Sequence, residues 1–497
     1  MSPVYGYLRR LATTAAAYQL ADVVAKFIAL ALLPVYTRHL SRADYGVAEL
    51  IGTLVIIVSI LVRAGIGEAF VRFWYTDEDA GRRDALARRA VLFLLAATSA
   101  AAALLAALAG PLSQEVLVHR DATTFLVGVL GLWAFTNLEL AYALLRVEER
   151  SRTYLLASLT NVALTIAATV ALVVFAGEGA RGLLLGNYAA SLLVLLGLWW
   201  SLRSRLRLPR GRAGGPAFGP LLRFGLPTVP ADASVFALNL VDRYYLFHQR
   251  GAAAAGLYSL GVKLAGVVVF TVRAFQYAWP PLAYSVSSDA EAARLYAFVT
   301  TYYVLLTGWV VAGLALLGRW VVRLLAAPSF YPAHEALPWV ALGWALYGLF
   351  VIFVVIAGRA RVSTRNFPAA LAGLAANVAL LLVLVPPLGI AGAGIALCGA
   401  YVVMLAAMHV LTRRLFAVAF EWARLGQLVL VLGGVTVAGE LALPTSGAAG
   451  LLLRALALAL IPVLLALTRF FRPEETARLR ALSRRRPRPA AASAGPG

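Results

Sequence analysis

Residues 182–215 read GLLLGNYAASLLVLLGLWWSLRSRLRLPRGRAGG, a nearly uninterrupted apolar run that is followed at once by five arginines. A helix of about 20 apolar residues is long enough to cross the roughly 30 Å hydrocarbon core of a bilayer. Arginines that flank such a run mark the cytoplasmic side of the membrane. This segment therefore predicts a membrane-spanning helix that ends at a basic cytoplasmic loop.

The same alternation of apolar run and short polar loop recurs along the whole chain, of which 62% is hydrophobic and 13% charged. Soluble domains carry about one-quarter charged residues, so the composition predicts an all-α integral membrane protein. We expect about 14 transmembrane helices. The predicted spans are 12–35, 45–66, 90–110, 122–145, 153–176, 182–202, 221–246, 253–278, 295–317, 336–358, 367–385, 392–412, 425–443 and 450–468.

The distribution of cations predicts the orientation. With the N-terminus in the cytoplasm, 31 of the 44 Lys and Arg residues fall in cytoplasmic segments and 7 in outer loops. An even number of spans then places the arginine-rich C-terminal tail in the cytoplasm too. We therefore expect a multi-pass protein of the cytoplasmic (inner) membrane. The net charge of +21 is accounted for by this topology, so anionic membrane lipids, and not nucleic acid, are the expected partners of the basic segments.

The basic linker at 203–220 follows the sixth predicted span and divides the chain into two halves. A shift of 210 residues aligns the halves without a gap, and six spans in each half make this a parallel repeat, as in several transporters. Chance similarity between apolar segments is the alternative. The matched pairs include Asp22 with Asp232, Gly46 with Gly256, and Arg63 with Arg273. The predicted domains are an N-terminal six-helix lobe with its linker (1–219), a C-terminal six-helix lobe (220–412), two extra helices (413–468) and a basic cytoplasmic tail (469–497).

Charged residues inside the predicted spans are the candidates for a functional site, because a cation at mid-bilayer costs roughly 2.5–3.5 kcal/mol. They lie on the first, second, seventh and eighth spans, which could line one cationic cavity. The candidate substrate-binding residues are Lys26, Arg63, Arg243, Lys263 and Arg273, and the candidate ion-coupling residues are Asp22, Glu49 and Asp232.

Each of these charges also has a structural interpretation. Asp22 and Lys26 are four residues apart, so they could pair on one helix face, and Arg63 and Arg273 could extend to the inner interface. Asp242 and Arg243 could form a structural pair near the outer end of their span. Glu49 shares a face with Arg63, about 21 Å away, and reduces the positive charge of the expected cavity.

The sequence lacks the signatures of an enzyme. Lysine occurs only at positions 26 and 263, so no phosphate-binding GxxxxGK[ST] loop exists, and the five histidines have no metal-ligand spacing. No loop is longer than about 20 residues, although a membrane glycosyl-transferring enzyme needs room for acid–base chemistry outside the lipid. We expect neither a cofactor nor a bound metal.

Residues 224–285, FGLPTVPADASVFALNLVDRYYLFHQRGAAAAGLYSLGVKLAGVVVFTVRAFQYAWPPLAYS, resemble polysaccharide (O-antigen) flippases. These belong to the multidrug/oligosaccharidyl-lipid/polysaccharide exporter superfamily. The segment LPVYTRHLSRADYGVAEL (33–50) resembles the first loop and second helix of the same family. The resemblance implies two six-helix lobes around a central cavity, with two further helices at the C-terminal end.

The resemblance also implies a function. Such proteins move a polyprenyl-diphosphate-linked oligosaccharide to the outer leaflet for surface polysaccharide synthesis, and other membrane proteins of polysaccharide assembly are possible further partners. Cations on the first, second, seventh and eighth helices meet the diphosphate in this family. A cation-coupled multidrug extruder of the same fold is the main alternative, followed by a membrane glycosyl-transferring enzyme and a structural membrane protein. An extruder would favour acids in the cavity, whereas bases predominate here.

Overall fold

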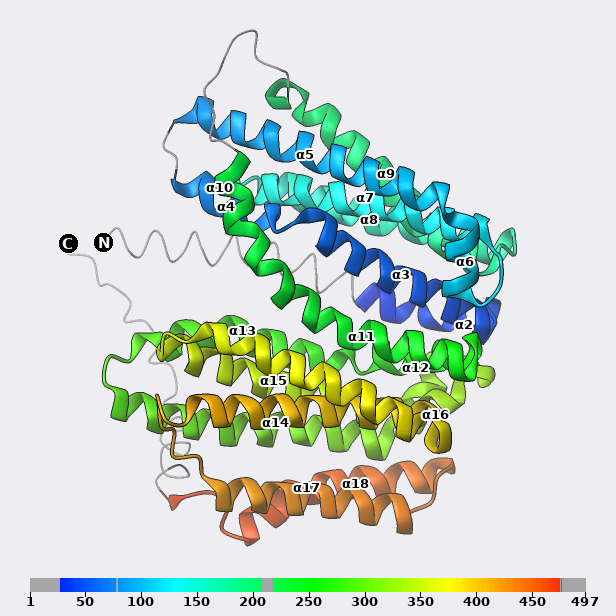
Figure 1. Cartoon of the computed structure of the whole chain (residues 1–497). Helices are drawn as coiled ribbons and strands as arrows, with labels where there is room; N and C mark the ends of the chain where they lie inside the picture. Colours follow the sequence, from blue (N-terminus) through cyan, green and yellow to red (C-terminus); the bar gives the residue numbers. More distant parts are fainter. Residues whose placement is uncertain (1–26, 77–78, 207–217, 474, 476–497) are drawn as a thin grey trace, which may run out of the picture.

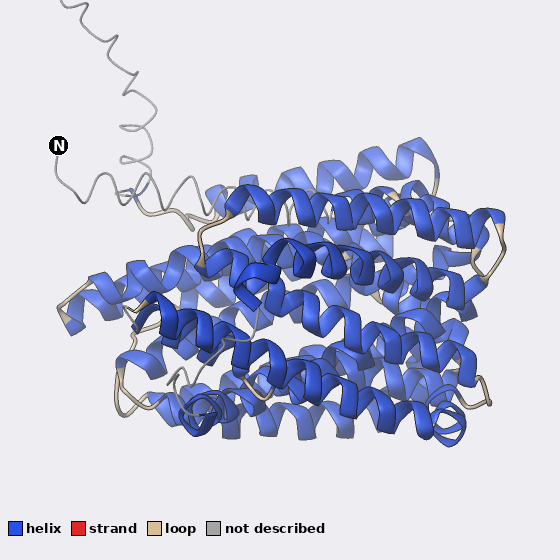
Figure 2. Ribbon diagram, turned by 90° about the horizontal axis from the view of Figure 1, so that it is seen from above, coloured by secondary structure: helices blue, strands red, loops and turns tan. Residues whose placement is uncertain are grey.

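The computed structural model describes residues 27–76, 79–206, 218–473 and 475. Within these ranges all regular structure is helical, and no strand is present (Figure 2). Ten of the described helices are long and apolar enough to cross a membrane, or 11 if one bent pair counts as a single span. The prediction of an all-α, multi-pass membrane protein is confirmed, whereas the count of 14 spans stays a prediction.

The helices form two groups that lie side by side in Figure 1. The N-terminal lobe, drawn from blue to blue-green, contains α2 (Leu33–His39), α3 (Arg42–Arg63), α4 (Ile66–Thr76), α5 (Ala80–Ala107), α6 (Ala109–Leu117), α7 (Ala122–Val147), α8 (Ser151–Val170), which ends in the π-helical turn η1 (Ala171–Phe175), and α9 (Gly179–Leu206).

The elements from residue 218 to residue 412, drawn in green and yellow, form the C-terminal lobe, except that the first of them, α10, packs on α4 of the N-terminal lobe (Figure 1). They are α10 (Phe218–Gly225), η2 (Leu226–Thr228), α11 (Val229–Arg250), α12 (Ala252–Leu264), α13 (Gly266–Ser285), α14 (Asp289–Leu325), η3 (Pro328–Glu335), α15 (Leu337–Arg359), η4 (Ser363–Arg365) and α16 (Asn366–Thr412). Two further helices, α17 (Trp422–Ala442) and α18 (Gly447–Leu467), pack against α14 on the outer side of this lobe (Figure 1).

The element α16 consists of two antiparallel helices. The backbone leaves helical geometry at Gly389, where φ is 56° and ψ is −130°, a conformation that glycine adopts without a steric penalty. Gly373 lies against the backbone of Ala400, and Gly399 lies against Leu380, so the two arms pack on each other. The two arms correspond to the two predicted spans at 367–385 and 392–412.

Two predicted spans are broken in ways that the sequence indicates only in part. Around Pro227 the predicted seventh span divides at the 3₁₀ turn η2 into α10 and α11. The predicted eighth span ends at residue 278, shortly before Pro280 and Pro281. Instead α13 runs through both prolines to Ser285, and the break lies at Ala265, where α12 and α13 meet at a bend of 45°. Neighbouring helices can compensate in lipid for the hydrogen bonds that a proline removes.

The predicted repeat has a structural counterpart at the boundary between the lobes. Helix α3 begins at Arg42 and α12 begins at Ala252, 210 residues later. A Cβ atom on Gly46 would overlap the carbonyl oxygen of Ala252, and a Cβ atom on Gly256 would overlap the carbonyl oxygen of Arg42. Because each contact is the equivalent of the other under the 210-residue shift, the two helices cross on the pseudo-two-fold axis of the repeat.

Several further contacts between the lobes lie near this crossing, at the end of the bundle that carries α6 and η3. We call it the closed end. Here Ala327 N donates to Thr37 Oγ1 over 3.0 Å, and Tyr45 packs edge-on against Phe330. His248 Nε2 lies 2.8 Å from the carbonyl oxygen of Glu115. The opposite end, which we call the arginine-rich end, carries the loops that join α4 to α5, α7 to α8, and α15 to α16.

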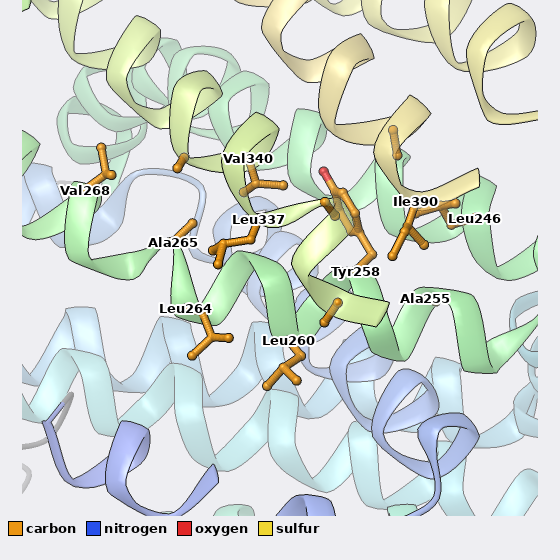
Figure 3. Close-up of a cluster of buried hydrophobic side chains, with 14 of the residues drawn as sticks. Leu246, Ala255, Tyr258, Leu260, Leu264, Ala265, Val268, Leu337, Val340 and Ile390 are labelled. Atoms are coloured by element: carbon orange, nitrogen blue, oxygen red, sulfur yellow. The ribbon is translucent and has the colours of Figure 1, made fainter. Parts of the chain in front are cut away.

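The largest apolar core surrounds α12. Tyr258, Leu260 and Leu264 of α12 pack with Leu337 of α15 and Ile390 of α16 (Figure 3). Since lipid is as apolar as these side chains, close van der Waals packing, and not removal from water, is what holds such helices together in a membrane. The same core includes Tyr45 and Leu50 of α3, so α12, which carries Lys263, is packed against both lobes.

Candidate functional site

Three charged side chains meet across the boundary between the lobes. Lys263 Nζ on α12 lies 2.8 Å from Glu49 Oε1 on α3, and the guanidinium of Arg243 on α11 lies 3.6 Å from Glu49 Oε2. Arg243 also donates to Thr53 Oγ1, one turn beyond Glu49, and Lys263 Nζ lies 5.2 Å from the centre of the Tyr45 ring. One carboxylate of the N-terminal lobe is thus held by two cations of the C-terminal lobe.

Local sequence explains how these residues are positioned. Ser41 and Asp44 form a reciprocal capping box that starts α3, which places Glu49 on the second turn. Lys263 is the penultimate residue of α12, directly before the bend at Ala265. The pairing was not predicted from the sequence, in which Lys263 was a candidate substrate-binding residue and Glu49 was compared only with Arg63.

Asp242 and Arg243 do not form the structural pair that was one alternative. Adjacent helical residues point about 100° apart, so Arg243 faces α3 whereas Asp242 faces the interior of its own lobe. Asp242 is fully buried and accepts hydrogen bonds from Tyr258 Oη over 2.9 Å and from Asn377 Nδ2 over 3.0 Å. These two bonds satisfy the carboxylate and tie α11 to α12 and α16.

The trio of Glu49, Arg243 and Lys263 lines a cavity of about 450 Å³, which we call the main cavity. Most of the remaining wall comes from α2, α3, α7, α8 and α9 of the N-terminal lobe. This volume is within the range of roughly 300–1,000 Å³ that is typical of small-molecule sites. The main cavity therefore combines a charged corner with a wall from the N-terminal lobe.

A second cavity of about 430 Å³ lies next to the first and is lined by α3, α4, α5 and α7. We call it the arginine cavity, because Arg63, Arg72 and Arg146 line it together with Glu68 and Glu139. None of the three arginines is within 4.0 Å of a carboxylate in the described part of the chain. The guanidinium of Arg72 instead stacks 4.5 Å from the centre of the Phe224 ring. Glu139 lines both cavities, which places them side by side.

The structure separates the predicted site residues into groups. Glu49, Arg243 and Lys263 lie together, whereas Arg63 lies in the arginine cavity. Arg273 is exposed on α13 and lines neither cavity. Asp22, Lys26 and the side chain of Asp232 lie outside the described residues.

Sequence reasoning missed two sets of residues. Arg72 and Arg146 were counted only among the arginines that predict the orientation in the membrane, since both lie close to predicted cytoplasmic loops. Asn161 and Asn187, which line the main cavity, attracted no notice, although an asparagine in a membrane span is itself a signal of a polar cavity. Among the described residues no group of three His, Cys, Asp or Glu side chains is arranged to hold a metal ion.

Comparison with known proteins adds independent information. The family described as polysaccharide biosynthesis protein matches residues 35–334. No curated protein sequence is similar to the chain at a significant level.

Among solved structures, the lipid II flippase MurJ in an inward closed conformation has a TM-score of 0.71 at 13% identity, over 95% of this chain and 100% of that chain. A multidrug resistance MATE transporter of the MOP superfamily has a TM-score of 0.63 in its inward-facing conformation, at 15% identity, over 84% of this chain and 95% of that chain. The outward-facing conformation of a multidrug resistance MATE transporter has a TM-score of 0.54, at 15% identity over 82% and 93%. At these identities the likeness establishes the transporter fold.

Proposed function

Because this chain belongs to the polysaccharide biosynthesis protein family, we propose that it is a flippase that moves a polyprenyl-diphosphate-linked oligosaccharide across the cytoplasmic membrane. The observation that carries this proposal is the charged corner of the main cavity. Two cations of one lobe converge there on an anionic group, at the depth of the membrane and at the boundary between the lobes. Such a pair of donors is suited to the oxygens of a phosphate.

In this proposal Glu49 holds the place of the substrate anion. A cation within the membrane that lacks a partner is costly, so the protein's own carboxylate neutralises Lys263 and Arg243 while no substrate is bound. An arriving diphosphate replaces Glu49, and the link between α3 and the C-terminal lobe is then broken. The exchange connects substrate binding to the movement of the lobes, because it removes an ionic contact that stabilises the present arrangement.

The closed end supports an assignment of this arrangement as inward-facing. The main parts of the lobes meet at the Gly46–Gly256 crossing and at the Thr37–Ala327 hydrogen bond, both remote from the arginine-rich loops. At the opposite end the two halves contact each other through the short helix α10, which packs on α4. The excess of arginine in these loops supports a cytoplasmic location for that end and for both termini. The arginine cavity would then meet the diphosphate first and the main cavity second. An inside-negative potential favours outward movement of an anion by about 2.3 kcal/mol per charge per 100 mV.

The reset of the empty carrier requires a further step. Glu49, once released from its two cations, is a candidate to bind a proton or a sodium ion, together with Asp22 and Asp232. Anionic lipids are the proposed partners of the basic segments, and other membrane proteins of polysaccharide assembly are further proposed partners of the protein. The boundaries of the four domains, at residues 219, 412 and 468, are part of the same proposal.

Transport in proteoliposomes tests the function. A fluorescent polyprenyl-diphosphate oligosaccharide and a leaflet-specific quencher would measure flipping by the wild-type protein, by Lys26→Ala/Lys263→Ala, and by Arg413→Ala/Arg414→Ala as a control with two exposed arginines removed. We expect wild-type and control proteins to accelerate flipping, and the lysine variant to lose this acceleration. Movement of cationic dyes under a proton gradient, without flipping of the lipid, would support a multidrug extruder instead.

A further inference from the structure

The main cavity has a second chemical character beyond its charged corner. Asn161 and Thr165 of α8 and Asn187, Tyr188 and Ser191 of α9 all line it. Asn161 and Thr165 are four residues apart, as are Asn187 and Ser191, so each pair lies on one face of its helix. Two neighbouring helices therefore present uncharged amide and hydroxyl groups to the same cavity, and we call this set the polar wall.

Most of these groups have no hydrogen-bond partner among the residues that the structure describes. Ser191 Oγ donates to the carbonyl oxygen of Asn187 over 3.1 Å and lies 3.5 Å from Asn161 Oδ1. The side chains of Thr165, Asn187 and Tyr188, and the amide nitrogen of Asn161, make no hydrogen bond to any residue that the structure describes. The polar wall thus offers at least two amide groups and two hydroxyls to whatever fills the cavity.

The amide side chains of the polar wall lie deep within the membrane. Asn161 is ten residues into α8, about 15 Å from its start, and Asn187 is eight residues into α9, about 12 Å from its start. Both therefore lie well inside the membrane, where an unpaired amide costs several kcal/mol unless water or a polar ligand reaches it. Other positions of the same helices, such as Leu156 and Leu193, are apolar and exposed, as a lipid-facing surface requires.

We propose that the polar wall binds the first sugars of the lipid-linked glycan, while Lys263 and Arg243 bind the diphosphate. This inference rests on the proposed flippase function and names the part of the substrate that each wall takes. In a polyprenyl-diphosphate glycan the first sugar is joined directly to the diphosphate, so the two chemistries must be adjacent in the site, as they are in the main cavity. Amides and hydroxyls both donate to and accept from sugar hydroxyls.

Two probes separate this inference from the general function. The first is a fluorescent polyprenyl diphosphate that carries an oligosaccharide, and the second is the same lipid without sugars. Flipping of both would be measured for the wild-type protein and for Asn161→Leu/Asn187→Leu. Asn366→Leu is the matched control, because Asn366 begins α16 and lines neither cavity.

For the double variant we expect at least a tenfold loss of flipping with the glycan-bearing lipid and less than a twofold loss with the bare lipid. Asn161→Gln/Asn187→Gln keeps the amides and should recover part of the activity. Melting temperature and gel filtration would identify a misfolded variant, in which case the single variants are compared. An equal loss with both probes, or no loss with the glycan-bearing lipid, would overturn the inference.

If the wild-type protein flips neither lipid, the proposed function fails, and binding then tests the polar wall separately. Titration calorimetry in detergent with the free oligosaccharide would be used. Binding that is present in the wild-type protein and absent in the double variant supports the sugar site. Absence of binding to the wild-type protein overturns it.

Discussion

Gly46 and Gly256 meet at the boundary between the two lobes, and 210 residues separate them in the chain. Each is the fifth residue of its helix, α3 or α12, and each faces the backbone carbonyl of the first residue of the partner helix. Residues related by a repeat can touch in this reciprocal way only near the axis that relates the two halves. The crossing therefore lies on the axis that relates the two halves and also at the closed end of the proposed transport path.

The crossing leads to a first prediction. Gly256→Ala places a methyl group against the carbonyl of Arg42, so it should force α3 and α12 apart and favour the form that is open at this end. Spin labels would be attached at Arg38→Cys and Gln249→Cys, after the single native cysteine, Cys398, is replaced by Ser. Double electron–electron resonance would then measure the distance between the two labels. We expect a longer distance in the variant. Gly433→Ala on α17, where a Cβ meets no atom within 4 Å, should leave the distance unchanged, and an unchanged distance in both would contradict the role of the crossing.

A second prediction concerns the carboxylate that the substrate is proposed to replace. Glu49→Gln leaves Lys263 and Arg243 without their anion, so a diphosphate should bind more tightly, by about tenfold or ~1.4 kcal/mol. Release should become slower, so the turnover rate should fall although affinity rises. Inorganic pyrophosphate binding and flipping rates would be measured side by side. Glu115→Gln on α6 is the control, and weaker pyrophosphate binding by Glu49→Gln would disprove the exchange.

A third prediction concerns the arginine cavity. If Arg72 and Arg146 attract the diphosphate before it reaches Lys263, then Arg72→Gln/Arg146→Gln should raise KM several-fold and leave kcat within about twofold. The effect should weaken with added salt, because charge attraction at an accessible site is screened. Arg413→Gln/Arg414→Gln removes the same charge from an exposed position elsewhere. Equal changes in the two double variants would argue against a specific role for the arginine cavity.

A fourth prediction concerns the stability of the two C-terminal helices. Arg454 on α18 is fully buried, pairs with Glu440, and donates to the carbonyl oxygens of Leu316, Leu443 and Pro444. Arg454→Leu should destabilise the protein by about 3–5 kcal/mol, because it leaves three carbonyl oxygens without their donor and removes the buried partner of Glu440. The fall in melting temperature in detergent would measure this.

Arg319→Leu provides the comparison for that measurement. Arg319 contacts the same carboxylate of Glu440 over 3.5 Å but is 30% exposed, so its loss should cost about 1 kcal/mol or less. A similar melting temperature for both variants would show that the buried network around Arg454 contributes little.

Much of the fold could be predicted because its signals are local. The length of an apolar run shows whether it can span the membrane, and the arginines beside it indicate its direction. The 210-residue shift could be found in the same way, since it requires a comparison of residue types and no contact. The hairpin within α16 was likewise expected from two apolar runs separated by a short segment around Gly389.

The candidate site was predicted less completely, because its geometry depends on which helix faces which. Lys263 was identified as a candidate, but its partner Glu49 lies 214 residues away on another helix. The rotation of each helix about its own axis determines such a contact, and neighbouring helices set that rotation. For the same reason Arg72 and Arg146 could not be distinguished from other loop-proximal arginines.

The sequence by itself determined that this chain is a multi-pass helical membrane protein with two related lobes, because lipid imposes length, polarity and charge rules on every span separately. Only the tertiary structure decided that Glu49 neutralises two cations, that three arginines share a cavity, and that Asn161 and Asn187 face the same space as Lys263. Those relations depend on packing between helices remote in the chain, which no local pattern of residues encodes.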